Sequence, residues 1–337
     1  MAKKSIRKIK AEEIVAKFKD TNNTALAKLL IKENPALYDN VDQARTCVRQ
    51  VRGSAGKFLR KYATDVKQMP NGLVYNPYEL PAEEHHENKY YSIKPSKDTV
   101  VGLLSDIHIP YQHNQALTCA LDHCKKEKLT HLILNGDIMD CYQISNFVKD
   151  PTMRSFKNEI EAVRSFLKTL TEKFEGVKIL YKEGNHEARY MRFMRSKAPE
   201  LLGVEAFTLP RLLGLKDLDI DHIPDNKLIQ LGHLMIIHGH EFGQAIFSPV
   251  NPARGYFLRA KTNVIGGHNH QVSVHSENNL EGKQLVAYST GHLADPHPEY
   301  KPINNWSHGF AIIKHTEEGK DINFVINNYK IINGKVY

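Results

Sequence analysis

The chain has 337 residues, of which 41% are hydrophobic, enough to bury a sizeable core in one large domain, alone or with a small second one. No apolar run approaches the roughly 18 residues that a membrane-spanning helix needs, so the sequence predicts no membrane partner. The four cysteines form no CxxC pair, which favours reduced thiols in a cytoplasmic protein.

Charge is distributed unevenly along the chain. Residues 1–68 contain sixteen Lys or Arg and seven Asp or Glu, a net charge of +9, whereas the remainder has 30 basic and 31 acidic residues, a net charge of −1. All of the overall +8 therefore comes from the N-terminal fifth. Such asymmetry indicates either a polyanion partner or a basic face that is only solvated, and composition leaves both interpretations open.

The basic segment has the pattern of a small all-α module. After a basic tail over residues 1–10 that we expect to be frayed, apolar residues recur at helical spacing over 12–19, 25–32 and 41–62. The second and third stretches are joined by a turn and resemble a helix-turn-helix. The sequence therefore predicts a helical domain over residues 1–68.

Three arginines would share one face of the third predicted helix, where recognition helices meet nucleic acid. They are Arg45, Arg49 and Arg52, at helical spacing, and they are the candidate nucleic-acid-binding residues. The alternative is an amphipathic bundle whose arginines only face water. No base-reading motif in the sequence decides between the two.

Residues 69–97 contain prolines, an Asn-Gly pair and a polar run without a core-forming period, which predicts a linker. A second domain then covers residues 98–337. Its first half alternates strands and helices, and its second half is mostly strands. The predicted strands are 100–104, 132–134, 177–181, 228–231, 234–237, 264–265, 272–275, 285–288, 310–314 and 323–327; the helices are 114–128, 156–174 and 252–261, with a less regular stretch at 190–226.

This order of elements predicts an α/β fold in which two mixed β-sheets pack face to face as a sandwich, with helices outside. The stretch Gly136-Asp137-Ile138-Met139-Asp140 directly follows one of the buried strands. Asp137 would then lie at the carboxyl end of that strand, where open α/β sheets collect ligands. A carboxylate buried there needs a metal or a basic partner to offset its desolvation.

Five apolar runs end in loops rich in His, Asp or Asn. They are Asp106-Ile107-His108, Gly136-Asp137, Gly184-Asn185-His186-Glu187, His238-Gly239-His240 and Gly267-His268-Asn269-His270. Taken alone, the polar side chains of each segment are explained more simply as structural residues that form hydrogen bonds. Five in succession predict a metal site, because a core has no reason to place so many such residues at strand ends.

The order D-x-H, G-D-x-x-D, G-N-H-E, H-G-H and G-H-x-H resembles that of the calcineurin-like metallophosphoesterases, over about residues 99–315. The resemblance implies a two-sheet α/β sandwich and a dinuclear metal centre. One metal would be held by Asp106, His108, Asp137 and His270, and the other by Asp137, Asn185, His238 and His268. Asp137 would bridge the two ions.

Two divalent ions of this kind repel, and a shared carboxylate with a metal-activated hydroxide offsets the repulsion and supplies a nucleophile at neutral pH. Mixed His and carboxylate ligands favour manganese, with iron, zinc or nickel as alternatives. The resemblance further implies that His186 acts as general acid or phosphate clamp. Asp140 would orient a metal ligand or His186.

Arginines downstream of the G-N-H-E segment could line a substrate channel, because arginine suits bidentate phosphate contacts. Arg189 is the candidate for substrate binding, since it lies two residues after that segment. Arg192, Arg195, Arg254 and Arg259 are further candidates, and a surface role explains most of them equally well.

Three functions follow as hypotheses. The first is a phosphodiesterase or nuclease in which the basic N-terminal module contacts nucleic acid. The second is a phosphomonoesterase or small-nucleotide phosphodiesterase; a protein phosphatase of this superfamily would have Arg where Cys141 follows the second aspartate of G-D-x-x-D. The third, a non-catalytic scaffold, is disfavoured because every expected ligand and His186 are present. The exact substrate and the oligomeric state stay open.

Overall fold

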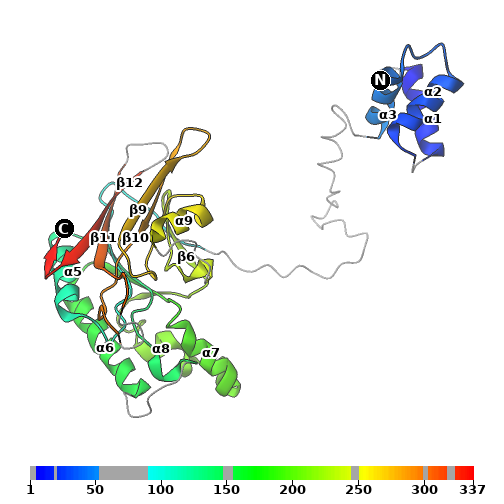
Figure 1. Cartoon of the computed structure of the whole chain (residues 1–337). Helices are drawn as coiled ribbons and strands as arrows, with labels where there is room; N and C mark the ends of the chain where they lie inside the picture. The colour runs from blue at the N-terminus through cyan, green and yellow to red at the C-terminus, as the bar shows by residue number, and fades with distance from the viewer. Residues whose placement is uncertain are drawn as a thin grey trace. The chain divides into compact units, whose positions relative to one another are not determined.

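The computed structural model describes residues 5–18, 21–52, 90–146, 155–243, 250–298, 303–316 and 323–337 (Figure 1). The chain divides into two compact units, residues 1–86 and 87–337. In the described part of the chain, no helix has the length and apolar character needed to span a bilayer.

The described residues of the N-terminal unit form three helices, α1 (Ile6–Lys17), α2 (Asn23–Glu33) and α3 (Val41–Val51). Asn22 and Asn40 cap α2 and α3, because each side chain accepts a hydrogen bond from a first-turn amide at 2.9 Å. The helices share a core that consists of Ala11, Ile14, Leu26, Ala27, Leu30, Tyr38, Ala44 and Val48. The prediction of an all-α module is confirmed.

Two boundaries of this unit differ from the prediction. The first helix begins at Ile6, inside the tail that we expect to be frayed, because Lys and Arg favour helix and the Tyr38 hydroxyl donates to the Arg7 carbonyl oxygen at 2.6 Å. The third helix ends at Val51. The rest of its predicted range, residues 53–62, and the predicted linker up to residue 89 lie outside the described residues.

The second unit contains two mixed sheets, as predicted. The seven-stranded sheet has the order β13 (Lys335–Val336), β12 (Phe324–Ile332), β11 (His308–His315), β2 (Val100–Leu104), β3 (His131–Asn135), β4 (Lys178–Lys182) and β5 (Asp221–Ile223). The six-stranded sheet has the order β1 (Tyr90–Ile93), β6 (Leu228–Leu231), β7 (Leu234–Ile236), β8 (Val264–Gly266), β10 (Gln284–Ser289) and β9 (Ser273–Asn278). Strands β2 to β5 are parallel neighbours, and β7, β8 and β10 are parallel in the other sheet.

Strand β13 lies beyond the last predicted strand, and two further strands lie where the sequence predicts a linker or a less regular stretch. Strand β1 falls in the predicted linker and pairs in parallel with β6. Strand β5 falls in the stretch predicted to be less regular and pairs with β4. Both are short edge strands whose pairing partners are distant in the sequence, so their local pattern is weak.

The helices of this unit are α5 (Asn114–Lys126), α6 (Phe156–Lys173), α7 (Ala188–Lys197), α8 (Leu209–Leu213) and α9 (Pro252–Ala260). Short 3₁₀ helices lie at η1 (Tyr142–Ile144), η2 (Pro199–Leu201), η3 (Glu205–Phe207) and η4 (His240–Phe242). Figure 1 shows α9 beside strands β9 and β10, and α5 beside β11.

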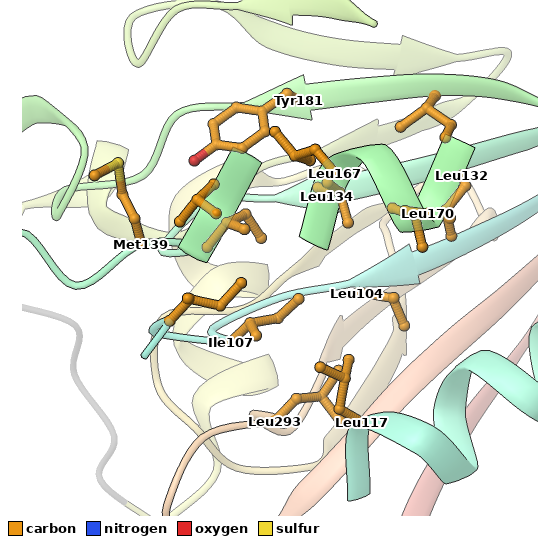
Figure 2. Packing of buried hydrophobic residues seen from close by; sticks show 14 of the residues in the cluster. Leu104, Ile107, Leu117, Leu132, Leu134, Met139, Leu167, Leu170, Tyr181 and Leu293 are labelled. Atoms are coloured by element: carbon orange, nitrogen blue, oxygen red, sulfur yellow. The ribbon is translucent and has the colours of Figure 1, made fainter. Parts of the chain in front are cut away.

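Alternation along the central strands divides the core into two layers. Val101, Leu103 and Ile133 point to the cluster between the sheets, where they meet Ile229, Leu231 and Ile236 of the six-stranded sheet. The opposite faces carry Leu104, Leu132, Leu134 and Tyr181, which pack against Leu167 and Leu170 of α6 and Leu117 of α5 (Figure 2). The sandwich with helices outside is therefore confirmed.

Hydrogen bonds between the loops join the ends of the two sheets. The amide nitrogens of Asp106 and His108 donate to carbonyl oxygens in the loop after β3, at 3.1 and 2.9 Å. The Asn135 side chain at the end of β3 donates to the carbonyl oxygen of Ile237, which follows β7, at 2.7 Å. The amide nitrogen of His186, after β4, donates to Oδ1 of Asp137 at 2.9 Å, and that of Gly267, after β8, donates to the carbonyl oxygen of His238 at 2.8 Å. The loops after β2, β3, β4, β7 and β8 consequently meet at one place.

Candidate metal centre

The five polar segments converge at this meeting of strand ends. Asp106 and His108 follow β2, Asp137 follows β3, Asn185 and His186 follow β4, His238 follows β7, and His268 and His270 follow β8. Their potential ligand atoms form three groups in which all atoms lie within 4.8 Å of one another: Asp106, His108 and His270; Asp137, His238 and His268; and His108, Asp137 and His186. The three groups share members and form one continuous site.

The first group contains three of the four residues that the resemblance implies for one ion, all except Asp137. Nε2 of His270 lies 3.1 Å from Oδ1 of Asp106 and 3.4 Å from Nε2 of His108. All three side chains are buried. Two ring nitrogens and a carboxylate oxygen that face each other at this spacing leave room for a cation between them.

The second group lies around Asp137. Oδ2 of Asp137 is 3.3 Å from Nε2 of His238 and 3.9 Å from Nε2 of His108, so one carboxylate oxygen faces both groups. Oδ1 of Asn185 lies 3.3 Å from the same His238 nitrogen. The donor set of nitrogen and oxygen atoms is of the kind that divalent cations bind, and Asp137 faces both groups.

Backbone strain is concentrated in these loops. The φ angles of Asp106, His108, Asp137, His268 and His270 are 56°, 52°, 52°, 64° and 58°, all in the left-handed region. Each non-glycine residue there costs on the order of 1 kcal/mol, and such strain persists only where surrounding contacts impose it. Gly136, at φ 83°, packs against the His238 ring so closely that a Cβ would lie 2.5 Å from Nδ1.

Burial and neighbouring charges shift the pKa values of two histidines of this site in opposite directions. Burial disfavours the charged form of His238, but the carboxylate of Asp137 beside it raises the pKa of the imidazole to about 10. Burial and the positive charge of His238 lower the pKa of His268 to about 4. Cations that enter the site therefore compete with a proton on His238, and acid weakens metal binding.

Asp140 joins two of the histidines. Its Oδ1 lies 3.0 Å from Nδ1 of His108 and 3.1 Å from Nδ1 of His186. Burial opposes ionisation of this carboxyl, but its hydrogen bonds to the two imidazoles hold its pKa below the usual range. Asp140 thus contacts both kinds of group that the sequence predicts it to orient, a metal ligand and His186.

Arg189 contacts the same cluster. Its Nη1 donates to the carbonyl oxygen of Asp140 at 2.9 Å, and its Nη2 lies 2.8 Å from Nε2 of His186. The guanidinium and the imidazole, both candidates for contact with the phosphate, therefore lie side by side. His240 is the one histidine of the polar segments outside the three groups.

Glu187 belongs to the G-N-H-E segment, but its sequence context predicts no role for it. Its carboxylate is 1% exposed and accepts five hydrogen bonds. The donors are the backbone nitrogens of Asp137 (2.9 Å), Ile138 (2.8 Å), Met139 (3.2 Å) and Gly184 (2.9 Å) and the Tyr181 hydroxyl (2.9 Å). Glu187 thereby fixes the loop that carries Asp137 to the loop that carries Asn185.

Lys182 and Glu241 support His238 in a similar way. The Lys182 ammonium, with no exposed surface, lies 3.0 Å from Oε1 of Glu241. Glu241 accepts hydrogen bonds from the backbone nitrogens of His238 at 3.0 Å and Gly239 at 2.6 Å. A buried ion pair between distant segments has no local sequence signal, because each partner alone has the character of a surface residue.

Glu159 of α6 is a buried carboxylate that accepts a hydrogen bond from the backbone nitrogen of Cys141. Burial, with the nearby charges of Asp140 and Glu187, raises its pKa to about 7. Because this pKa lies above the ordinary value, the contribution of Glu159 to stability is complete at low pH and is lost as pH rises through 7.

Replacing Glu159 by Gln removes this titration, so the stability of the variant relative to the natural chain should increase by about 3 kcal/mol between pH 4.5 and pH 8. Urea unfolding followed by the fluorescence of Trp306, the single tryptophan, measures the difference. A difference that is the same at both pH values would show that the carboxyl does not titrate in this range.

The three arginines of the N-terminal unit differ in their surroundings. Arg45 is exposed and forms an ion pair with Asp42 at 2.8 Å, and Arg49 is exposed on the same helix. Arg52 is half-buried; it donates to Oδ1 of Asn23 at 2.9 Å and to the carbonyl oxygen of Phe18 at 3.2 Å. Arg52 therefore joins the end of α1 to the start of α2, a contact that the sequence does not predict.

One protein family matches most of the second unit. Residues 99–327 match the family model described as calcineurin-like phosphoesterase. A search of curated proteins gives no match. Among solved structures, the chain is similar to vacuolar protein sorting 29 from Cryptosporidium parvum, with 15% sequence identity and a TM-score of 0.38 over 72% of this chain and 96% of that chain.

Proposed function

The chain belongs to the calcineurin-like phosphoesterase family, and from this premise we propose that it is a metal-dependent phosphodiesterase that acts on nucleic acid. The observation that carries the proposal is the convergence of three groups of buried or half-buried residues with metal-ligand atoms, in which His108 and Asp137 each belong to two groups. The basic N-terminal unit supports the choice of nucleic acid as substrate.

The residues proposed to hold two divalent ions are those that the family resemblance implies. Asp106, His108 and His270 would bind one, Asn185, His238 and His268 the other, and Asp137 both. When bound, such ions supply positive charge to phosphoryl oxygens and lower the pKa of a water molecule. Manganese is our first choice because the donors mix imidazole nitrogen with carboxylate and amide oxygen.

His186 is proposed to place a proton on the leaving oxygen, with Asp140 orienting the ring through Nδ1. Arg189 is proposed to bind the phosphate. Because Nη2 of Arg189 lies 2.8 Å from Nε2 of His186, exchange of this contact for a phosphoryl oxygen would leave Nε2 able to carry the proton.

Turnover of an activated aryl phosphodiester and of the matching monoester, each with Mn²⁺ and with a chelator, tests the proposal. Preferential, chelator-sensitive hydrolysis of the diester is the expected result, and cleavage of DNA and RNA would then be compared. Preference for the monoester would replace the proposal with a phosphomonoesterase. Absence of turnover in a chain that binds two metal ions would replace it with a non-catalytic scaffold.

The exposed arginines of α3 provide a separate test of the nucleic-acid partner. Changing Arg45 and Arg49 together to Gln should weaken binding to nucleic acid and reduce the slope of log Kd against log salt by about one for each phosphate that the variant no longer neutralises. Lys28 and Lys32 of α2, also exposed, are the matched control when both are changed to Gln. If both double variants weaken nucleic-acid binding equally, only the overall positive charge of the unit contributes to binding. If neither variant weakens it, the N-terminal unit takes no part in substrate binding.

A further inference from the structure

A cavity of about 680 Å³ lies next to the candidate metal centre. Its lining includes Asn185, one of the proposed ligands, and His240, whose ring lies 5.3 Å from that of His238 between centroids. The remaining lining comes from the loop between β4 and α7, from α7, from the start of α8 and from the segment around β5. Its volume is in the range of small-molecule sites, roughly 300–1,000 Å³.

One part of the cavity wall is apolar. Met191 of α7 and Leu209 and Pro210 of α8 contribute to it. Met191 is 39% exposed, although it is a large hydrophobic side chain. A wall of this kind suits a flat, weakly polar group such as a nucleobase, which gains from leaving water on its faces.

Two arginines supply positive charge to the same cavity. Arg192 and Arg195 are three residues apart on α7, so they lie on the same side of the helix, and both line the cavity. Arg192 Nη2 donates to the carbonyl oxygen of Asn185 at 2.9 Å. Its guanidinium is therefore held against the segment that carries a proposed metal ligand.

Two of the acidic groups in the lining are already engaged. Oε1 of Glu183 lies 2.8 Å from Nε2 of His222, and Glu187 accepts the five hydrogen bonds described above. Asp225 is the third acid of the lining. Both engaged carboxylates already accept hydrogen bonds within the protein, which leaves Arg192 and Arg195 for a phosphate, and the amino groups of a base provide donors that Asp225 accepts.

We propose that this cavity is the subsite for the nucleotide next to the scissile phosphate, and that Arg195, with Arg192, binds the following phosphate of the chain. The inference rests on the proposed function and adds that the substrate is a chain of at least two phosphodiesters rather than an isolated diester. In this proposal the base packs against the apolar wall of the cavity. The following phosphate binds to the two arginines, which α7 holds on the same cavity.

A comparison of dinucleotides with trinucleotides isolates the contribution of the following phosphate to catalysis. TpT and UpU contain one phosphodiester, whereas TpTpT and UpUpU contain two, with the same bases and the same type of bond to be cleaved. In the full-length, Mn²⁺-loaded chain, Arg195→Gln should lower the ratio of kcat/KM for the trinucleotide to that for the dinucleotide by about tenfold, the loss expected for one charge-assisted contact.

Lys197→Gln is the matched control, because Lys197 is an exposed cation on the same helix that does not line the cavity. In Lys197→Gln, the ratio of kcat/KM for the trinucleotide to that for the dinucleotide should equal the ratio of the natural chain. Met191→Ser should lower kcat/KM for both nucleotides relative to the aryl diester, since it alters the wall that receives the base.

Equal ratios in Arg195→Gln, Lys197→Gln and the natural chain would overturn the subsite while leaving a phosphodiesterase in place. Hydrolysis of the aryl diester without cleavage of either nucleotide series would overturn both the subsite and the nucleic-acid substrate. Preference of the natural chain for a monoester would remove the proposed function itself, so the three failures are distinguishable.

Discussion

Replacing Asp137 by Asn is expected to lower phosphoester hydrolysis by more than about 100-fold, since even the partners of metal ligands contribute roughly 10–100-fold. Oδ2 of Asp137 lies within 3.9 Å of ring nitrogens on both His108 and His238. An amide of the same shape removes the negative charge that two neighbouring cations would share. Bound metal per chain should fall together with turnover.

Metal content after dialysis, measured by elemental analysis, and turnover of the aryl diester are the two readouts for Asp137→Asn. Asp122→Asn on α5 is the control, because Asp122 is exposed and takes no part in the three ligand groups. Full metal content and full turnover in Asp137→Asn would refute the bridging role. A folded variant that retains both ions but not turnover would assign Asp137 to the reaction rather than to metal retention.

Replacing Glu187 by Ala is expected to have the largest effect on stability, a loss of about 4 kcal/mol in the free energy of unfolding. The substitution leaves four backbone nitrogens and the Tyr181 hydroxyl without their acceptor in a site that is 1% exposed. Glu187→Gln keeps one acceptor oxygen and should lose about half as much. Unfolding in urea, followed by the fluorescence of Trp306, gives the free energies of unfolding of the natural chain and of both variants.

Glu161→Ala is the control for this series, because Glu161 is exposed on α6 and its ion pair with Lys157, at 3.6 Å, is of the surface kind that contributes at most about 1 kcal/mol. If Glu187→Ala and Glu161→Ala unfold at the same urea concentration, the carboxylate does not hold the two loops together. Because the loops carry Asp137 and Asn185, we also expect Glu187→Gln to bind metal more weakly than the natural chain.

Local patterns determined much of this fold. The central strands β2, β3 and β4 and helices α5 and α6 lie within two residues of their predicted ranges. Short apolar runs between turns and long amphipathic stretches have distinct periods, which is the information that a sequence carries directly. The polar residues after each strand were identifiable for the same reason, since strand ends in parallel sheets meet at one edge.

The convergence of those residues at one site required the tertiary structure. His108 and His270 are separated by 162 residues, and their Nε2 atoms lie 3.4 Å apart. The sequence suggested the pairing only through a family resemblance. Geometry then showed that Asp140 contacts His108 and His186 together, and that Arg189 lies against His186.

By itself, the sequence determined the two-sheet architecture, the basic helical unit and the set of polar strand-end residues, because each depends on neighbours in the chain. Tertiary structure alone decided that Glu187 and the Lys182–Glu241 pair support the loops that carry the candidate metal ligands. It also decided that Arg52 forms contacts within its own unit and that Arg192 and Arg195 line a cavity beside Asn185. These roles depend on contacts between distant segments. A charged residue that is buried needs a specific partner, and the local sequence does not show whether the residue is buried.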